Sequence, residues 1–262
     1  MTEILEINKN NTIFKVYNFR SGDFWKKFQD SKWENEFFSN FDKIKDKNVK
    51  TFVDIGASDG PLTLYCASKV LQTVSIEPSN MVFDKLMKNV SLNDFKNINI
   101  LHAAVGTENK KTKFISGEEF SDIMFLDEQE GGYDINMLEL SKIIKEFNVK
   151  KFILKIDIEG YEFNLLSNQN FFKIIEKNTP ELFLGVHIGF SSIFRYKKAK
   201  YRFLQKFYNL SKTFQEYKTL LKLFRLYKYI YVDGKKLNKL FFLSKKYYRK
   251  NFDIFLTNEI HL

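Results

Sequence analysis

The segment Thr51-Phe-Val-Asp-Ile-Gly-Ala-Ser-Asp-Gly60 decides the fold of this chain of 262 residues. Its apolar residues form a short run that is typical of a buried parallel strand. Gly56 and Gly60 bracket a tight turn, and a predicted helix follows it. A second predicted strand, at 72–77, ends in Glu77, which lies 21 residues after Gly56. This order predicts a doubly wound α/β unit with a nucleotide-like ligand at the turn.

Two cofactors suit such a unit, NAD and S-adenosylmethionine (SAM). A pyrophosphate site needs three glycines as G-x-G-x-x-G, and this turn has only Gly56 and Gly60. Asp54 lies at the end of the first strand, where a carboxylate would repel a diphosphate and attract the ammonium and sulfonium groups of SAM. Glu77 stands at the spacing at which a carboxylate meets ribose hydroxyls. The residues therefore favour SAM over NAD, and over a strand–turn–helix without a ligand.

A second segment, Phe152-Ile-Leu-Lys-Ile-Asp-Ile-Glu-Gly-Tyr-Glu162, supplies candidate catalytic groups. Lys155, Asp157 and Glu159 alternate with apolar residues, so their side chains point to one side of a predicted strand. Ligands bind beyond the carboxyl ends of parallel strands, which places Asp157 and Glu159 near the reacting methyl group. A hydroxyl acceptor needs a base or a metal ion. We expect Asp157 to be the base, with His187 as the other candidate.

Each of these assignments has a structural alternative. Lys155, Asp157 and Glu159 could form an ion-pair cluster that the fold itself requires, and His187 could be a hydrogen-bonded core histidine. Asp157 and Glu159 could bridge a divalent ion such as Mg²⁺ or Mn²⁺, although the sequence does not complete a ligand set. His102 follows a predicted strand near the expected adenine, where stacking or packing suits it better than catalysis.

The two segments and their neighbours resemble the FkbM family of SAM-dependent methyltransferases over about residues 30–190. The matching residues are Asp54–Gly60, Glu77 and Pro78, His102–Gly106, and Lys155–Glu162. The resemblance implies a class I methyltransferase fold, which is Rossmann-like and doubly wound, with a mostly parallel seven-stranded sheet and helices on both faces. It also implies methyl transfer from SAM to a hydroxyl of a sugar, a glycan or a glycosylated metabolite.

The strand argument and the resemblance together give the candidate site residues. The candidate catalytic residues are Lys155, Asp157, Glu159 and His187, and the expected SAM site is made of Glu34, Asp54, Gly56, Ala57, Ser58, Gly60, Glu77, Pro78, His102 and Ala103. Glu34 is included because Trp33-Glu34 resembles a Trp/Tyr-Glu pair that the family has upstream of the glycine turn. Two departures lie near the acceptor side. The usual Thr-Leu-Asp is replaced by Asn136-Met-Leu-Glu139, and Tyr161 stands where a small residue is common.

We predict a single SAM-dependent methyltransferase domain. Its expected parts are an N-terminal helical cap at 1–50, a cofactor-binding core at 51–190, an extended basic helical insertion at 191–228 and the last two strands at 229–262. In the core, strands are expected at 51–55, 72–77, 98–105, 152–158 and 181–187, and helices at 61–70, 80–93, 137–147 and 160–168.

Positive charge is concentrated in the insertion and the residues after it. The net charge is +10, and residues 191–250 contain 18 Lys or Arg but only two acidic residues. Apolar residues recur there at helical spacing, at Phe203, Phe207, Leu210, Phe214, Tyr217, Leu221 and Phe224. Three interpretations remain: a helix that packs on its own fold, a helix that lies on an anionic membrane surface, or a surface that binds nucleic acid.

Other features narrow the function class. The one cysteine, Cys66, excludes a disulfide framework and favours a reducing compartment. No signal-peptide pattern is evident and no apolar run approaches 18 residues, so we expect a cytoplasmic protein with peripheral membrane contact through the basic segment. No Asn/Asp-Pro-Pro-Tyr turn supports amino methylation of bases. RNA 2′-O-methylation stays open, as does a non-catalytic protein that binds nucleic acid or membrane on the same fold.

Overall fold

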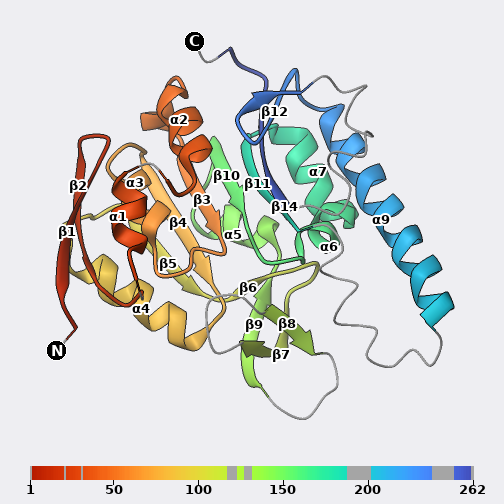
Figure 1. Ribbon diagram of the computed structural model, residues 1–262, viewed down its shortest axis with the longest axis horizontal. Coiled ribbons are helices and arrows are strands. Elements are labelled where there is room, and N and C mark those ends of the chain that lie inside the picture. Colours follow the sequence, from red (N-terminus) through yellow and green to blue (C-terminus); the bar gives the residue numbers. More distant parts are fainter. Residues whose placement is uncertain are drawn as a thin grey trace.

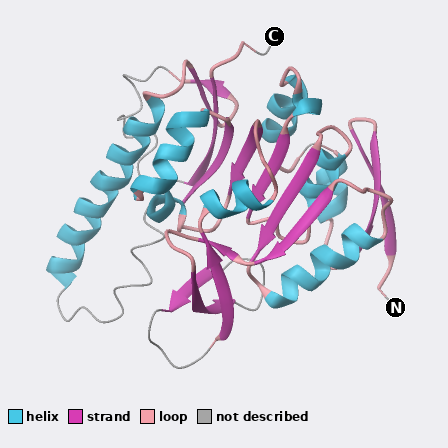
Figure 2. Ribbon diagram, turned by 180° about the vertical axis from the view of Figure 1, so that it is seen from behind, coloured by secondary structure: helices cyan, strands magenta, loops and turns pink. Residues whose placement is uncertain are grey.

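The computed structural model describes residues 2–20, 22–30, 32–116, 123–126, 132–187, 202–237 and 251–260. A central sheet of eight described strands runs through the molecule, and helices lie on both of its faces (Figure 1, Figure 2). In spatial order the strands are β13 (Lys235–Lys236), β12 (Tyr229–Val232), β14 (Asn251–Thr257), β11 (Glu181–His187), β10 (Phe152–Ile156), β3 (Thr51–Ile55), β4 (Gln72–Glu77) and β5 (Ile98–His102). The five strands from β11 to β5 are parallel, and β14, β12 and β13 pair antiparallel with their neighbours.

The predicted α/β class is confirmed. The sheet has eight strands instead of seven, because two residues after a turn add the short β13.

Two apolar clusters, one on each face of the sheet, hold the helices in place. The first includes α1 (Phe24–Gln29), α2 (Asn35–Lys43) and α3 (Pro61–Ala67), and the second includes α5 (Leu140–Glu146), α6 (Glu162–Ser167), α7 (Gln169–Asn178) and α9 (Arg202–Phe224). The turn η1 (Lys47–Val49) precedes β3, and α4 (Asn80–Ser91) packs against β5 and β2 (Thr12–Tyr17). Side chains alternate between the faces, so Phe52 and Ile153 join the first cluster and Val53 and Leu154 join the second. The same alternation directs Lys155 to the first face.

The N-terminal segment begins with a β-hairpin, so the prediction of a helical cap over 1–50 is wrong for its first part. β1 (Ile4–Lys9) pairs with β2 across Asn10 and Asn11, which both adopt the positive φ that a two-residue hairpin turn requires. Alternate residues of β2 are buried, which is the pattern of a strand. The helical part of the predicted cap is divided into α1 and α2, and Glu34 takes a left-handed conformation between them.

A second sheet was not predicted. It joins β6 (Ala104–Val105), β9 (Tyr133–Leu138), β7 (Lys110–Ser116) and β8 (Ile123–Leu126), in that order. The single strand expected at 98–105 is therefore wrong, because a bend at Ala103 carries the chain from β5 into the second sheet. The helix expected at 137–147 begins only at Leu140, because the preceding residues pair with β7 and β6.

The basic insertion contains the predicted helix as α9, which lies beside α6 and α7 at one side of the molecule (Figure 1). Tyr217, Leu220, Leu223 and Phe224 are buried on it, whereas Phe214 of the predicted apolar seam is 71% exposed. Tyr217, Leu221 and Phe224 of the predicted seam pack against the second cluster, so the seam is confirmed there and is wrong at Phe214. The side chains of Phe203, Phe207 and Leu210 lie outside the described residues. Residues 188–201 and 238–250 lie outside the described residues. In the described ranges, no helix is both long and apolar enough to cross a bilayer. Contact with membrane or nucleic acid stays a prediction.

Replacing Gly56 with alanine should destabilise the fold severely. Gly56 has a φ of +84°, and a Cβ there would overlap the backbone oxygen of Asp157. We expect a loss of about 3 kcal/mol or more in the free energy of unfolding, measured by urea denaturation, because conformational strain and steric overlap add. Gly22 is the matched control, with a φ of +73° and no atom near a built Cβ. Its alanine variant should lose only about 1–2 kcal/mol. Equal losses in the two variants would contradict the steric argument.

Candidate active site

A cleft opens at the carboxyl ends of β3 and β4, where several predicted cofactor residues meet. Its walls include Ile55, Gly56, Ile76, Pro78, Ala103 and Ile158. The predicted residues Gly56, Pro78 and Ala103 thus line one space, although they come from three different loops. Ala57 holds the glycine turn against β4, because its N–H donates to the backbone oxygen of Ile76 over 3.1 Å. Apolar walls of this kind suit the flat face of a purine.

Glu77 is clamped at the end of β4 by two backbone N–H groups. Its Oε2 accepts from Ser58 over 2.9 Å, and its Oε1 accepts from Ser79 over 2.9 Å. Burial raises the pKa of the Glu77 carboxyl to about 7. Each carboxylate oxygen keeps a further lone pair, so Glu77 can also accept hydrogen bonds from ribose hydroxyls. The predicted residues Glu77 and Ser58 are brought together, and Ser58 takes part through its backbone.

A buried hydroxyl beside Glu77 supports the fit of SAM to this cleft. Ser79 Oγ is buried and has no hydrogen-bond partner among the described residues. Ser79 is the N-cap residue of α4, yet its side chain makes no capping hydrogen bond. A hydroxyl of a bound nucleoside would satisfy this orphaned group. Ser79 was not among the predicted site residues, although a serine at the start of a helix directly after Glu77-Pro78 was an available signal.

His102 lies beside the cleft and is already engaged. Its Nε2 is 3.1 Å from the backbone oxygen of Pro78, which also accepts from the Tyr133 hydroxyl over 2.9 Å. The imidazole stacks on Phe83 of α4, with ring centroids 4.6 Å apart. These contacts are those of the packing role expected for His102, and none of them reaches the residues proposed for proton transfer.

Asp54 lies beneath the glycine turn instead of in the open cleft. It is 1% exposed, and its Oδ2 accepts from Thr63 Oγ1 over 2.9 Å. Thr63 belongs to α3, which begins after the predicted residue Gly60 as its N-cap. Burial raises the pKa of Asp54 to about 6, against the attraction of Lys155. Asp54 can therefore act on a bound sulfonium only through space, and this attraction stays a prediction.

Arg20 ties the N-terminal segment to the glycine turn, a contact that the sequence pattern did not indicate. Its guanidinium forms a bidentate ion pair with the fully buried Asp59 and donates to Ser58 Oγ over 3.0 Å. It also lies over the ring of Phe24, 3.9 Å from the centroid. The planar fork of arginine suits such a bidentate contact. The pair fixes the backbone of Ser58, whose N–H clamps Glu77.

Lys155 is the centre of the charged groups on the other side of the glycine turn. Its ammonium donates to Asp157 Oδ2 over 2.8 Å and lies 3.8 Å from Glu34 Oε1. Burial lowers the pKa of Lys155, but Asp157, Glu34 and Asp54 outweigh it and raise this pKa above its usual value. Burial also raises the pKa of Glu34 to about 8. Predicted residues from three distant parts of the sequence thus meet at one buried cation.

Glu162 holds the turn that follows β10. It is fully buried in the first turn of α6. Its Oε1 accepts from the N–H of Ile158 over 3.0 Å, and Oε1 and Oε2 accept from the N–H of Gly160 over 3.1 and 3.0 Å. The turn needs this support because Glu159 adopts a positive φ, which is uncommon outside glycine. Glu162 was not among the predicted site residues, although an acid in the first turn of a helix was the signal.

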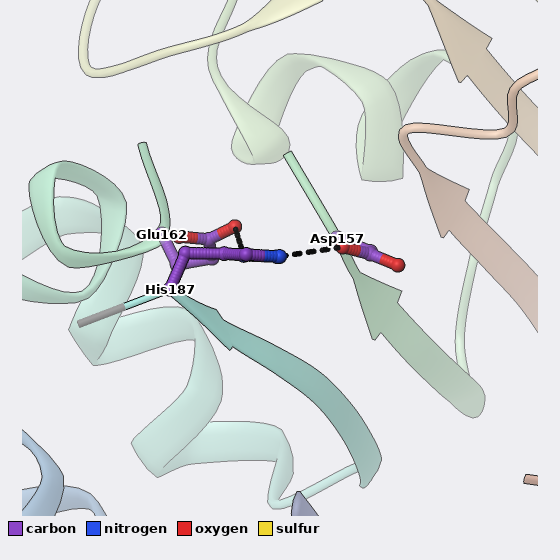
Figure 3. A group of neighbouring side chains, drawn as sticks. All are labelled: Asp157, Glu162 and His187. Atoms are coloured by element: carbon purple, nitrogen blue, oxygen red, sulfur yellow. Dashed lines mark hydrogen bonds and ion pairs between the residues drawn. The ribbon is translucent and has the colours of Figure 1, made fainter. Parts of the chain in front are cut away.

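The same carboxylate orients His187 (Figure 3). Nδ1 of His187 donates to Glu162 Oε1 over 3.0 Å, which directs Nε2 toward Asp157 Oδ1 at 3.9 Å and Glu159 Oε2 at 3.4 Å. Burial lowers the pKa of His187, but Glu162, Asp157 and Glu159 outweigh it and raise this pKa to about 9. The imidazole is therefore protonated at neutral pH. Of the two predicted bases, Asp157 is the one that can accept a proton there.

Asp157 is an ionised carboxylate at the border of the cofactor cleft. Its side chain is 28% exposed, and its backbone oxygen abuts Gly56 of the glycine turn. Burial raises the pKa of Asp157, but Lys155 and His187 outweigh it and hold this pKa below its usual value. Burial instead raises the pKa of Glu159. The turn thus carries one firmly ionised carboxylate and a second, weaker acid close to the residues that line the cleft.

A divalent ion does not fit these residues well. Asp157, Glu162 and His187 have candidate ligand atoms within 4.8 Å of one another, whereas the predicted pair was Asp157 and Glu159 (Figure 3). Glu162 is already taken up by backbone N–H groups and His187, and Asp157 by Lys155. A metal ion would have to displace these contacts. No step proposed below depends on one.

The variant Glu162→Gln should lower the pKa of His187 by at least one unit, because it removes the charge that stabilises the imidazolium. Nitrogen-15 NMR of the imidazole measures this pKa, and Glu159→Gln is the matched control with a smaller expected fall. The wild-type pKa of about 9 lies above the unfolded value of about 6.5. This contact's contribution to stability is therefore complete below pH 6.5 and is lost as pH rises through 9. An unchanged pKa in Glu162→Gln would contradict the assignment.

Comparison with known proteins gives a family. The model of the methyltransferase FkbM domain matches residues 54–232. No curated protein matches the sequence. Similar solved structures include a protein from Streptococcus mutans assigned as a methyltransferase and bound to SAH (10% identity, 84% of this chain and 96% of that chain, TM-score 0.43). Others are a protein from Listeria monocytogenes assigned as a SAM-dependent methyltransferase (13%, 84% and 94%, TM-score 0.39) and the human methyltransferase 10 domain containing protein (11%, 86% and 80%, TM-score 0.42). Because the family match spans more than half of its length, this chain belongs to the FkbM family of SAM-dependent methyltransferases.

Proposed function

We propose that this methyltransferase transfers the methyl group of SAM to a hydroxyl of a sugar or glycan, free or attached to a metabolite. The observation that carries the proposal is the state of Asp157. It is an ionised, partly exposed carboxylate at the carboxyl end of β10, beside the cofactor cleft. A hydroxyl is a poor nucleophile until a base accepts its proton, and Asp157 is placed to be that base.

The residues around Asp157 support this role. When bound, SAM supplies an activated methyl group, so the protein mainly has to align the acceptor oxygen and receive its proton. Asp157 accepts the hydroxyl proton as the oxygen gains its new bond to carbon. The hydroxyl becomes strongly acidic at that stage, so a carboxylate with a lowered pKa suffices. Lys155 and His187 keep Asp157 ionised beforehand, through contacts of 2.8 and 3.9 Å.

The groups near Asp157 favour a polyhydroxylated acceptor. Glu34 and Glu159 lie close to it, through Lys155 and His187 respectively, and Asp253 of β14 belongs to the same charged cluster. Carboxylate oxygens accept hydrogen bonds from hydroxyl groups, which sugars supply at high density. An RNA 2′-hydroxyl would instead bring backbone phosphates toward these acids, which is electrostatically unfavourable.

The acceptor class and the base can be tested together. Wild-type protein incubated with isotope-labelled SAM and a mixture of glycans should transfer the label to sugar, as read by mass spectrometry. The variant Asp157→Asn should lower this turnover at least about 100-fold, with SAM affinity unchanged by calorimetry, because the base is lost and the cofactor cleft is intact. Full turnover in the variant would sink the base assignment. Label on total RNA instead of glycans would favour the 2′-O-methylation alternative.

The cofactor side has its own prediction. Glu77→Ala should weaken SAM binding at least tenfold, about 1.4 kcal/mol, because charge-assisted hydrogen bonds to the ribose are lost. Calorimetric titration with SAM measures the change. Glu108→Ala, a change at an exposed residue paired with Lys110 on the surface, is the control and should bind normally. Unchanged affinity in Glu77→Ala would mean that the ribose is held elsewhere.

A further inference from the structure

A second concave site lies on the first face of the sheet, next to Asp157. We call it the edge pocket. Its polar lining comes from Glu34, Glu36 and Asn40 of the α2 region, Lys155 of β10 and Asp253 of β14. The space opens to solvent, and about 30 Å³ of it is accessible to the centre of a water molecule. Among the described residues, none of these side chains lines the cofactor cleft, although Glu34 was predicted as a SAM-binding residue. Lys155 also attracts Asp54 through space.

The edge pocket and the cofactor cleft both have lining residues next to Asp157. The cleft includes Gly56, which abuts the backbone of Asp157, whereas the edge pocket includes Lys155 and Gly185. Lys155 holds Asp157 Oδ2, and a Cβ added at Gly185 would lie 2.7 Å from Asp157 Oδ1. The missing side chain at Gly185 therefore leaves the carboxylate next to the pocket. In open α/β sheets, ligands bind at this carboxyl edge of the strands.

The pocket combines an aromatic floor with acidic walls. Phe183 and Phe255 stack with ring centroids 4.5 Å apart, Tyr231 stacks on Phe255 at 6.0 Å, and Phe37 lies 4.6 Å from Phe183. These rings belong to three neighbouring strands and to α2, and all four line the pocket. An apolar floor with a few carboxylates and amides around it suits a sugar ring, which has apolar C–H faces and hydroxyls at its edge.

Charge decides which sugars suit the pocket. Its described lining has three carboxyl groups, from Glu34, Glu36 and Asp253, and a single cation, Lys155, which is engaged with Asp157. Glu34 is largely protonated at neutral pH because its pKa is about 8, so Glu36 and Asp253 carry the negative charge. A phosphate or a carboxylate on the ligand would find no uncommitted positive group there. Hydroxyls would find acceptors, and an ammonium group would be attracted. The acidic groups also affect one another. Burial raises the pKa of Glu34 to about 8, and Asp157 and Asp253 add to this rise, against the attraction of Lys155.

From this geometry we infer that the edge pocket binds the methyl acceptor and selects neutral or amine-bearing sugars over anionic ones. The inference rests on the proposed function and adds the position and charge of the acceptor. The pocket places the ring over β11 and β14, so that one hydroxyl at its edge reaches Asp157. The cofactor cleft adjoins the backbone of the same residue at Gly56, so the acceptor oxygen can meet the methyl group directly while its proton passes to Asp157.

Binding of matched sugars tests the inference without knowledge of the natural acceptor. The probes are methyl α-glycosides of glucose, galactose and mannose, each as the neutral sugar, the 2-amino-2-deoxy sugar and the uronic acid. Saturation-transfer NMR on SAH-loaded protein gives their affinities. We expect at least one neutral or amino sugar to bind at least tenfold more tightly than its uronic acid. Equal binding of the uronic acids, or no binding by any probe, would overturn the inference.

Variants of two pocket residues then test whether the edge pocket is the part of the protein that discriminates against uronic acids. Asp253→Asn and, independently, Glu36→Gln should each reduce the discrimination against the uronic acid at least threefold, with SAH affinity unchanged as evidence of folding. Asp134→Asn is the matched control, because Asp134 is an exposed acid on the second sheet, paired with Lys113. Discrimination that stays at the wild-type value in both pocket variants would overturn the inference.

The outcome also separates this inference from the proposed function. Suppose that glycans are methylated, but that neither pocket variant changes the KM for the acceptor or the enzyme's preference for neutral over anionic acceptors. The proposed function then stands, and the assignment of the edge pocket as the acceptor site is wrong. If labelled methyl groups reach only a different class of acceptor, such as RNA, both fail.

Discussion

The candidate active site depends on the neutralisation of one buried ammonium group, that of Lys155. A buried cation is costly unless anions surround it, and here Asp157, Glu34 and Asp54 do so from three separate elements. The requirement acts in both directions. The carboxylates stabilise the lysine, and the lysine keeps Asp157 ionised within a sheet that would otherwise favour its neutral form. The candidate base is therefore prepared by the fold before any substrate binds.

Glu162 is the second constraint, and it acts through geometry. One buried carboxylate accepts from the turn after β10 and from His187, so the positions of Asp157, Glu159 and the imidazole are coupled. A buried carboxylate without hydrogen bonds would lower the stability of the fold, and so would buried N–H groups without acceptors in the turn. The carboxylate of Glu162 and the N–H groups of the turn therefore stabilise one another. The positive φ of Glu159 is tolerated because this network over-determines the local backbone.

What could be predicted from sequence was local. The run from Thr51 to Glu77 carries its strand, turn and helix signals within a few residues, and the structure places these elements within three residues of their predicted ends. The strand 181–187 was also correct, because it is a continuous apolar run. The second sheet depends on pairing between Lys110–Ser116 and Tyr133–Leu138, which no local pattern specifies. The role of Glu162 toward His187 likewise arises only when α6 and β11 meet in space.

The turn after β10 has an evolutionary consequence. The cation, the candidate base, the residue with positive φ and the carboxylate that holds the turn all fall between Lys155 and Glu162, so a large part of the candidate site lies in one contiguous octapeptide. The rim that would meet the acceptor is assembled from remote pieces, including Glu36 and Asp253. Mutation can reshape that rim while leaving the octapeptide intact. A substitution at Glu36 or Asp253 therefore changes the rim without altering any residue of that octapeptide.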